Sequence, residues 1–167
     1  MELTTKERLS LINQFKILEA LYPTEAEYYA NNRRALEGGY TLHYEWLVEN
    51  LSSELSADQC REVLDILDMY RAITHSISQL EDGDVLRQHH NAKFSGFDGN
   101  NESQLMGYVR YFIVDLDRYP ELRDSEYPNF NSHTRMLDRY RTMLARWRPS
   151  QDQFNLDRDQ LATILGA

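Results

Sequence analysis

The strongest constraint on the fold is a long run of apolar residues at helical spacing in the middle of the chain. Ser56 and Gln59 form a capping-box pattern, in which each side chain satisfies a free backbone N–H group of the first turn. Apolar residues follow at three- and four-residue steps, and neighbours such as Ile66 widen the apolar face: Cys60, Val63, Leu67, Tyr70, Ile73, Ile77 and Leu80. Because a helix this apolar must be buried, the segment predicts a central helix of an all-α fold.

The same spacing predicts helices on both sides of this segment. N-terminal to it we expect helices over 4–21, 25–37 and 40–51, of which the first begins with a Thr4/Glu7 capping box. C-terminal to it we expect a helix over 101–119, an irregular stretch containing Pro128, a helix that begins at Asn131 or Ser132, and a short helix opened by Asp157. No convincing alternating strand was found. We therefore predict one compact all-α domain of about six helices over residues 1–167.

Residues 82–100 lack helical periodicity and contain three glycines. A loop of this length in a compact domain is either functional or disordered. Phe94 and Phe97 would be costly to leave in water, so we predict that the loop is ordered.

Composition limits the classes of protein that the chain can form. Hydrophobic residues make up 41% and charged residues 27%, which is ordinary for a globular protein. No apolar run approaches the roughly 20 residues that a membrane helix needs, and residues 1–7 lack a signal-peptide pattern. The single cysteine, Cys60, excludes an intramolecular disulfide, and its register predicts burial. These features favour a cytoplasmic location.

Net charge argues against direct nucleic-acid binding. The chain carries a formal charge of -9, whereas binding along a phosphate backbone requires a basic surface. Residues 42–80 resemble a helix-turn-helix only in outline, because the second helix would present Asp58 and Glu62 to the phosphates. We expect neither nucleic acid nor membrane as a direct partner.

Charge is distributed unevenly along the chain. The predicted helix from His133 to Arg148 carries arginines at five positions, Arg135, Arg139, Arg141, Arg146 and Arg148, whereas residues 45–68 are strongly acidic. These arginines can hold a phosphate or carboxylate, or they can meet the acidic segment within one chain or between subunits. Together with 11 tyrosines, this separation predicts a homodimer or other homo-oligomer whose association weakens with salt, and allows a protein partner.

Several stretches, spread over essentially the whole chain, are similar to the YfbU family of bacterial proteins. They are residues 8–15 with Gly39 and Tyr40, residues 65–70, residues 94–98 with 107–112, and residues 130–136 with Tyr140, Met143 and Trp147. The resemblance implies an uncharacterised helical protein, with no assigned reaction and no catalytic set to carry over. Some relatives join this domain to a small DNA-binding module, for which we expect no room in 167 residues.

The loop before residue 103 and the start of the later helix contain the best candidates for a site. Glycines and backbone donors near a helix N-terminus can hold an anion, although Asp98 and Glu102 would themselves neutralise that end. His133 is a candidate acid or base, with capping and packing as the alternative. The weak candidates for ligand binding are Phe97, Asp98, Glu102, Arg110, Asn131, His133, Arg135 and Arg139.

No metal or cofactor is expected. None of the five histidines belongs to a zinc pattern, and we interpret His89–His90 as a solvated pair. No phosphate-binding loop, Rossmann fingerprint or nucleophile elbow is present. The favoured hypothesis is a regulatory module that acts by interaction or small-ligand binding and not by catalysis. The alternative is a hydrolase or nuclease acting on a phosphate-containing substrate, with His133 as acid or base and the nearby arginines holding charge.

Overall fold

The computed structural model describes residues 1–123, 126–127, 129–150 and 152–167. The protein is all-α, and it divides into two compact units, residues 1–53 (unit 1) and residues 54–167 (unit 2). The expected irregular stretch around Pro128 includes positions outside the described residues. The division does not by itself test the prediction of a single domain, which stays a prediction.

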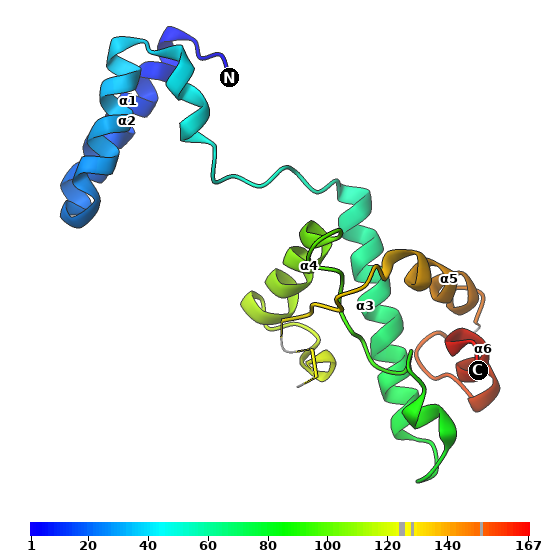
Figure 1. Cartoon of the computed structure of the whole chain (residues 1–167). Helices are drawn as coiled ribbons and strands as arrows, with labels where there is room; N and C mark the ends of the chain where they lie inside the picture. Colours follow the sequence, from blue (N-terminus) through cyan, green and yellow to red (C-terminus); the bar gives the residue numbers. More distant parts are fainter. Residues whose placement is uncertain (124–125, 128, 151) are drawn as a thin grey trace. The chain divides into compact units, whose positions relative to one another are not determined.

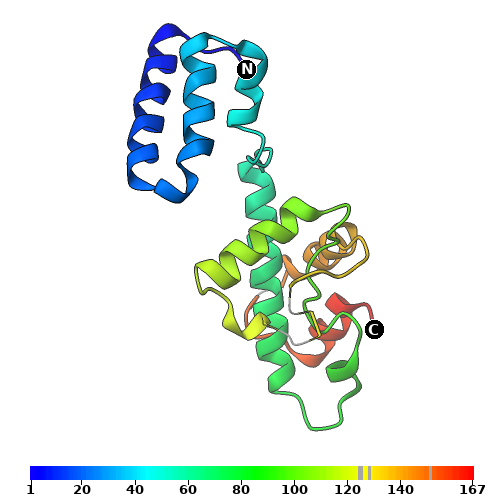
Figure 2. The ribbon, with the colours of Figure 1, turned by 60° about the vertical axis from the view of Figure 1, so that its left-hand side comes forward.

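Unit 1 is a helical hairpin followed by a short helical segment. Helices α1 (Thr5–Leu21) and α2 (Ala26–Gly38) lie side by side, joined by the 3-10 turn η1 (Pro23–Glu25), as Figures 1 and 2 show. The predicted capping box at the start of α1 is confirmed, because the Thr4 hydroxyl accepts the Glu7 N–H and the Glu7 carboxylate accepts the Thr4 N–H. Gly39 ends α2 in the left-handed conformation, at φ +70°.

The predicted helix over 40–51 is wrong in type and length. The chain forms a 3-10 helix, η2, over Thr41–Leu47. No side chain caps its N-terminus, and its last turn closes through i→i+3 bonds such as Val48 N–H to Glu45 O at 3.2 Å. A short uncapped segment gains little from α-helical propagation, so the tighter turn is adopted.

Unit 2 is built around α3 (Ala57–Ser78), the predicted central helix. Its Ser56/Gln59 capping box is present, and Val63, Leu67 and Ile73 are fully buried. Helices α4 (Ser103–Arg110), α5 (Leu137–Trp147) and α6 (Arg158–Leu165) all contact α3, and Figure 1 shows α4 on one side of it and α5 on another. The short helices η3 (Val85–Gln88) and η5 (Pro120–Leu122) complete the unit.

Two predicted helices of unit 2 have different bounds. The helix expected over 101–119 is α4 followed by a π-helical turn, η4 (Tyr111–Asp115), where the Leu116 N–H reaches back five residues to Tyr111 O. The later helix begins at Leu137, several residues after the expected Asn131 or Ser132. Its N-terminus receives its cap from another part of unit 2, which sequence spacing does not reveal.

Candidate functional site

The two segments that carry the predicted site, the loop before residue 103 and the residues around Ser132, contact each other. The Phe97 N–H donates to Phe130 O at 3.0 Å, and the Ser132 N–H donates to Phe97 O at 3.1 Å. These bonds form an isolated parallel bridge between Phe97 and Asn131. We call the segments 94–102 and 130–137 the loop junction.

Glu102 is the cap of α5. Its carboxylate accepts the Met136 N–H and the Leu137 N–H, both at 3.0 Å, and also the Asp98 N–H at 3.0 Å. A carboxylate at a helix N-terminus satisfies free donors and opposes the helix dipole. Glu102 was expected to neutralise the start of the helix that follows it, but its carboxylate caps α5 and makes no cap hydrogen bond to α4.

Other polar candidates in the loop junction bind one another. Asp98 is only 4% exposed and accepts the Asn100 N–H at 3.0 Å and the Asn101 side-chain amide. The Asn101 amide, followed by the Asn100 N–H, lowers the pKa of the Asp98 carboxyl. The Asn131 side-chain oxygen accepts the Gly99 N–H and the His133 N–H, each at 3.0 Å. The polar groups of the loop junction therefore form hydrogen bonds with one another.

Close packing explains why the loop junction needs a glycine. Gly96 has φ +82°, and a Cβ built there would lie 2.0 Å from Phe130 O. Phe97 beside it is fully buried, and Phe94 is 3% exposed. Both rings belong to the hydrophobic core of unit 2, which is the burial from which an ordered loop was predicted.

The remaining candidates differ in their surroundings. His133 is exposed at φ +56°, and it precedes α5 instead of beginning that helix as expected. Arg135 donates to the Asn101 side-chain oxygen at 2.7 Å, and Arg139 approaches the Asn91 side-chain oxygen at 3.5 Å. Arg110 is exposed at the end of α4. The ligand-binding and catalytic roles of these residues stay predictions.

Arginines of α5 and its C-cap reach the acidic segment within one chain, as one alternative proposed. Arg141 binds Glu62 through two nitrogens, at 2.7 and 2.9 Å, and lowers the pKa of that carboxyl. Arg148 donates to Asp65 at 2.6 Å. Arg146 instead approaches Thr163 O and Ile164 O at the end of α6, at 3.3 and 3.5 Å.

The cysteine and the histidine pair differ from their expected environments. Cys60 is half-buried and not buried, with its sulfur 3.9 Å from Leu55 O. His90 is exposed but His89 is half-buried, and their ring centroids lie 4.3 Å apart. Burial, followed by the neighbouring His90, lowers the pKa of His89. Within the residues that the structure describes, no group of three or more His, Cys, Asp or Glu could hold a metal ion.

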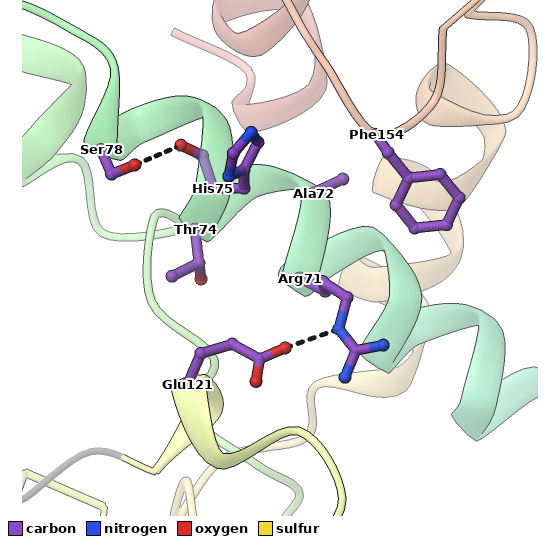
Figure 3. A pocket seen from close by; sticks show the side chains of 7 residues that line it. All are labelled: Arg71, Ala72, Thr74, His75, Ser78, Glu121 and Phe154. Atoms are coloured by element: carbon purple, nitrogen blue, oxygen red, sulfur yellow. Dashed lines mark hydrogen bonds and ion pairs between the residues drawn. The ribbon is translucent and has the colours of Figure 1, made fainter.

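A cavity of about 480 Å³ that was not predicted from the sequence lies beside α3, and we call it the α3 cavity (Figure 3). Glu121 of η5 and the ring of Phe154 face α3 across it, and its lining residues are Arg71, Ala72, Thr74, His75, Ser78, Glu121 and Phe154. The Arg71 guanidinium donates to Glu121 at 2.6 Å and lies 3.9 Å from the centroid of the Tyr119 ring. Polar residues at 71, 74, 75 and 78 share one face of the central helix. This polar face is the sequence pattern that marks the position of the cavity.

Unit 1 presents an unusual amount of apolar surface. Within α1, all of whose residues are described, none is buried. The buried residues of α2 and η2 are Ala30, Asn32, Leu36 and Tyr44. The large apolar side chains that unit 1 exposes include Leu9, Ile17, Leu21, Tyr22, Tyr28, Tyr40, Leu42, Trp46 and Leu51.

The fold and its contacts define an all-α protein with no helix, among the described residues, long and apolar enough to cross a membrane. The residues on which the family resemblance was based lie in α1, just after α2, in α3, in α4 and η4, in the loop junction and in α5. Residues 1–167 match the model of the YfbU domain. The chain therefore belongs to the YfbU family.

Proposed function

We propose that this protein acts by association, and that unit 1 joins two copies of the chain. The observation that carries the proposal is the apolar surface of α1. Leu9 and Ile17 are each 59% exposed and Leu21 is 64% exposed, whereas monomeric proteins rarely leave large contiguous apolar surfaces in water. An uncovered surface of this kind is typical of a protein–protein contact.

Helix α1 has two apolar faces, of which only one packs within unit 1. The Phe15 ring lies 6.3 Å from the Tyr29 ring of α2, and Arg8 donates to Leu36 O at 2.7 Å. Leu9, Ile17 and Leu21 lie away from that face by their helical positions. Exposed large apolar side chains that gather on one side of a helix are typical of a contact surface, so this second side calls for another partner.

A second copy fits the spacing of the exposed residues. Leu9 and Ile17 lie four residues on either side of Asn13. An antiparallel copy of α1 centred there places each Leu9 opposite an Ile17, so one contact is made twice about a two-fold axis. Two such hairpins together make a four-helix arrangement, which is a common way for helices to bury two apolar faces.

This proposal changes the expected response to salt. Arg141 and Arg148 already pair with acids of their own chain, so we base the association on apolar contact. Salt screens charges between exposed groups but does not weaken apolar burial. We expect the dimer to persist at high salt.

Sedimentation velocity on the full chain tests the proposal. We expect a dimer at micromolar concentration, and we expect the double variant Leu9→Lys/Ile17→Lys to be monomeric because it places charges at the centre of the contact. Val85→Lys is the matched control, since Val85 is 71% exposed in unit 2. A monomeric wild type, or a double variant that remains dimeric, overturns the proposal.

A thermal measurement covers the case in which the double variant unfolds. If unit 1 is stabilised by a second copy, the wild-type melting temperature of its helices rises with protein concentration. A melting temperature independent of concentration contradicts the dimer.

The hydrolase or nuclease alternative stays a prediction, because no contact of His133 singles out a reaction. Its test is cleavage of RNA or simple phosphoesters by the purified protein, lost in His133→Ala at an unchanged melting temperature.

A further inference from the structure

A second cavity adjoins the α3 cavity and differs from it in charge. It has a volume of about 240 Å³ and shares Thr74 and Glu121 with the α3 cavity. We call it the basic cavity, because Arg87, Lys93 and Arg123 line it, with Phe94 among its apolar walls. Two cavities with common walls can hold two parts of one ligand.

The described residues that line the basic cavity include three cations and one acid, Glu121. Its shared acid, Glu121, is already paired with Arg71 at 2.6 Å. Its three cations have other carboxylate partners: Arg123 with Asp117 at 2.8 Å, Lys93 with Glu126 at 3.6 Å, and Arg87 with Asp82 at 3.9 Å. The side chains of these acids are between 59% and 107% exposed, and ion pairs at such positions contribute little. An incoming anion can therefore replace them at low cost.

Backbone contacts hold the two arginines in place. Arg87 donates to Ser78 O, the last carbonyl of α3, at 3.4 Å, and to two carbonyls just beyond it, Glu81 O at 3.2 Å and Leu80 O. Arg123 donates to Ile113 O at 2.6 Å. Guanidinium groups fixed before a ligand arrives lose less freedom on binding.

The α3 cavity offers the complementary environment. Arg71 is neutralised by Glu121 and lies against the Tyr119 ring, while Ala72 and Phe154 supply apolar walls. Its volume lies within the usual range for small-molecule sites. Figure 3 shows the Phe154 ring on the side of this cavity away from Glu121.

We propose that the two cavities together bind a small amphipathic anion. The apolar group lies in the α3 cavity and the carboxylate or phosphate lies in the basic cavity, against Arg87, Lys93 and Arg123. This site lies wholly in unit 2 and does not depend on the association proposed for unit 1.

Calorimetric titration of the full chain tests the site with four probes below their micelle concentrations: octanoate, octyl phosphate, octanol and inorganic phosphate. We expect one or both amphipathic anions to bind at least about tenfold more tightly than octanol and phosphate, because only they fill both cavities. Comparison of octanoate with octyl phosphate identifies the headgroup. Equal affinities for octanol and the amphipathic anions, or binding of none of the four, overturns the proposal.

Variants separate a binding role from a structural one. Arg123→Gln is expected to raise Kd about tenfold, and Phe154→Ala about fivefold, because they remove a charge-assisted contact and an apolar wall. Glu121→Gln is expected to lower Kd about twofold, because it removes an acid that lines both cavities and leaves the shape intact. A loss of folding cannot produce tighter binding.

Arg61→Gln is the control, since Arg61 lies on α3 outside both cavities and pairs with the exposed Asp58 at 2.6 Å. We expect its Kd to equal that of the wild type. If Arg123→Gln and Phe154→Ala bind as the wild type does at unchanged melting temperatures, the site assignment is wrong.

Discussion

Units 1 and 2 are both helical, but they differ in how far they bury their large apolar side chains. Unit 2 buries Leu67, Ile73, Phe97 and Val109 almost completely around α3. Unit 1 leaves Leu9, Ile17 and Leu42 in water, although α1 begins with the same kind of capping box as α3 of unit 2. Good local helix signals therefore do not indicate how well a segment is enclosed. Enclosure in unit 2 comes from segments distant in the sequence, and unit 1 has no comparable set.

The comparison is tested most strongly by removing one aromatic ring from each unit. Phe97→Ala is expected to cost about 3–5 kcal/mol of unfolding free energy, because Phe97 is fully buried. Tyr22→Ala, at a side chain 50% exposed, is expected to cost less than about 1 kcal/mol. Urea unfolding followed by circular dichroism gives both values. Similar losses would show that the two units are equally well packed.

Alanine at two left-handed glycines is the next largest test. In Gly96→Ala the new Cβ meets the backbone at Phe130 O, so we expect a loss above about 2 kcal/mol. In Gly39→Ala the nearest atom, at 3.3 Å, is the end of the Arg8 side chain, and we expect about 1 kcal/mol from the backbone conformation. Segment-resolved hydrogen exchange reports each unit separately. A larger effect in unit 1 would reverse our interpretation.

Helix caps provide a smaller test. Glu102→Ala is expected to cost about 1–3 kcal/mol, because the backbone donors of Met136 and Leu137 lose their acceptor. Glu7→Ala removes only half of a local capping box in unit 1, and we expect a smaller loss. Thermal melts of both variants, with segment-resolved exchange over residues 5–21 and 137–147, measure the difference. Equal losses would show that the two caps contribute alike.

Surface ion pairs should contribute least to the free energy of unfolding, and we expect to detect them through the pKa values of their carboxyl groups. Arg33 lowers the pKa of Glu19 in unit 1, and Arg141 lowers that of Glu62 in unit 2. A lowered carboxyl pKa stabilises the fold above the unfolded value of roughly 4.3, and this contribution is lost as the pH falls through the folded value. Arg33→Met and Arg141→Met should each raise the partner's pKa, as measured by carboxyl carbon NMR titration. An unchanged pKa would exclude the pair.

Local signals explain what the sequence predicted well. The capping boxes opened by Thr4, Ser56 and Asp157 each lie within four consecutive residues, and all three are present. The all-α class and the central helix followed from apolar spacing alone. These features need no knowledge of distant contacts.

Non-local contacts explain the rest. The start of α5 was placed too early because its cap, Glu102, lies 34 residues before Met136. The α3 cavity was missed because its walls include Glu121 and Phe154, far from α3 in the sequence. The π-helical turn at Tyr111–Asp115 has no recognised sequence signature, so the break in the predicted helix was not foreseen.

The position of α3 in the chain has a consequence for synthesis. Asp65 and Ser76 of α3 make hydrogen bonds with Arg148 and Leu156, at sequence separations of 83 and 80 residues. When α3 leaves the ribosome, those partners have not yet been translated. Its wide apolar face therefore stays uncovered until those partners emerge. During this interval the nascent chain is most prone to aggregation and to binding by chaperones.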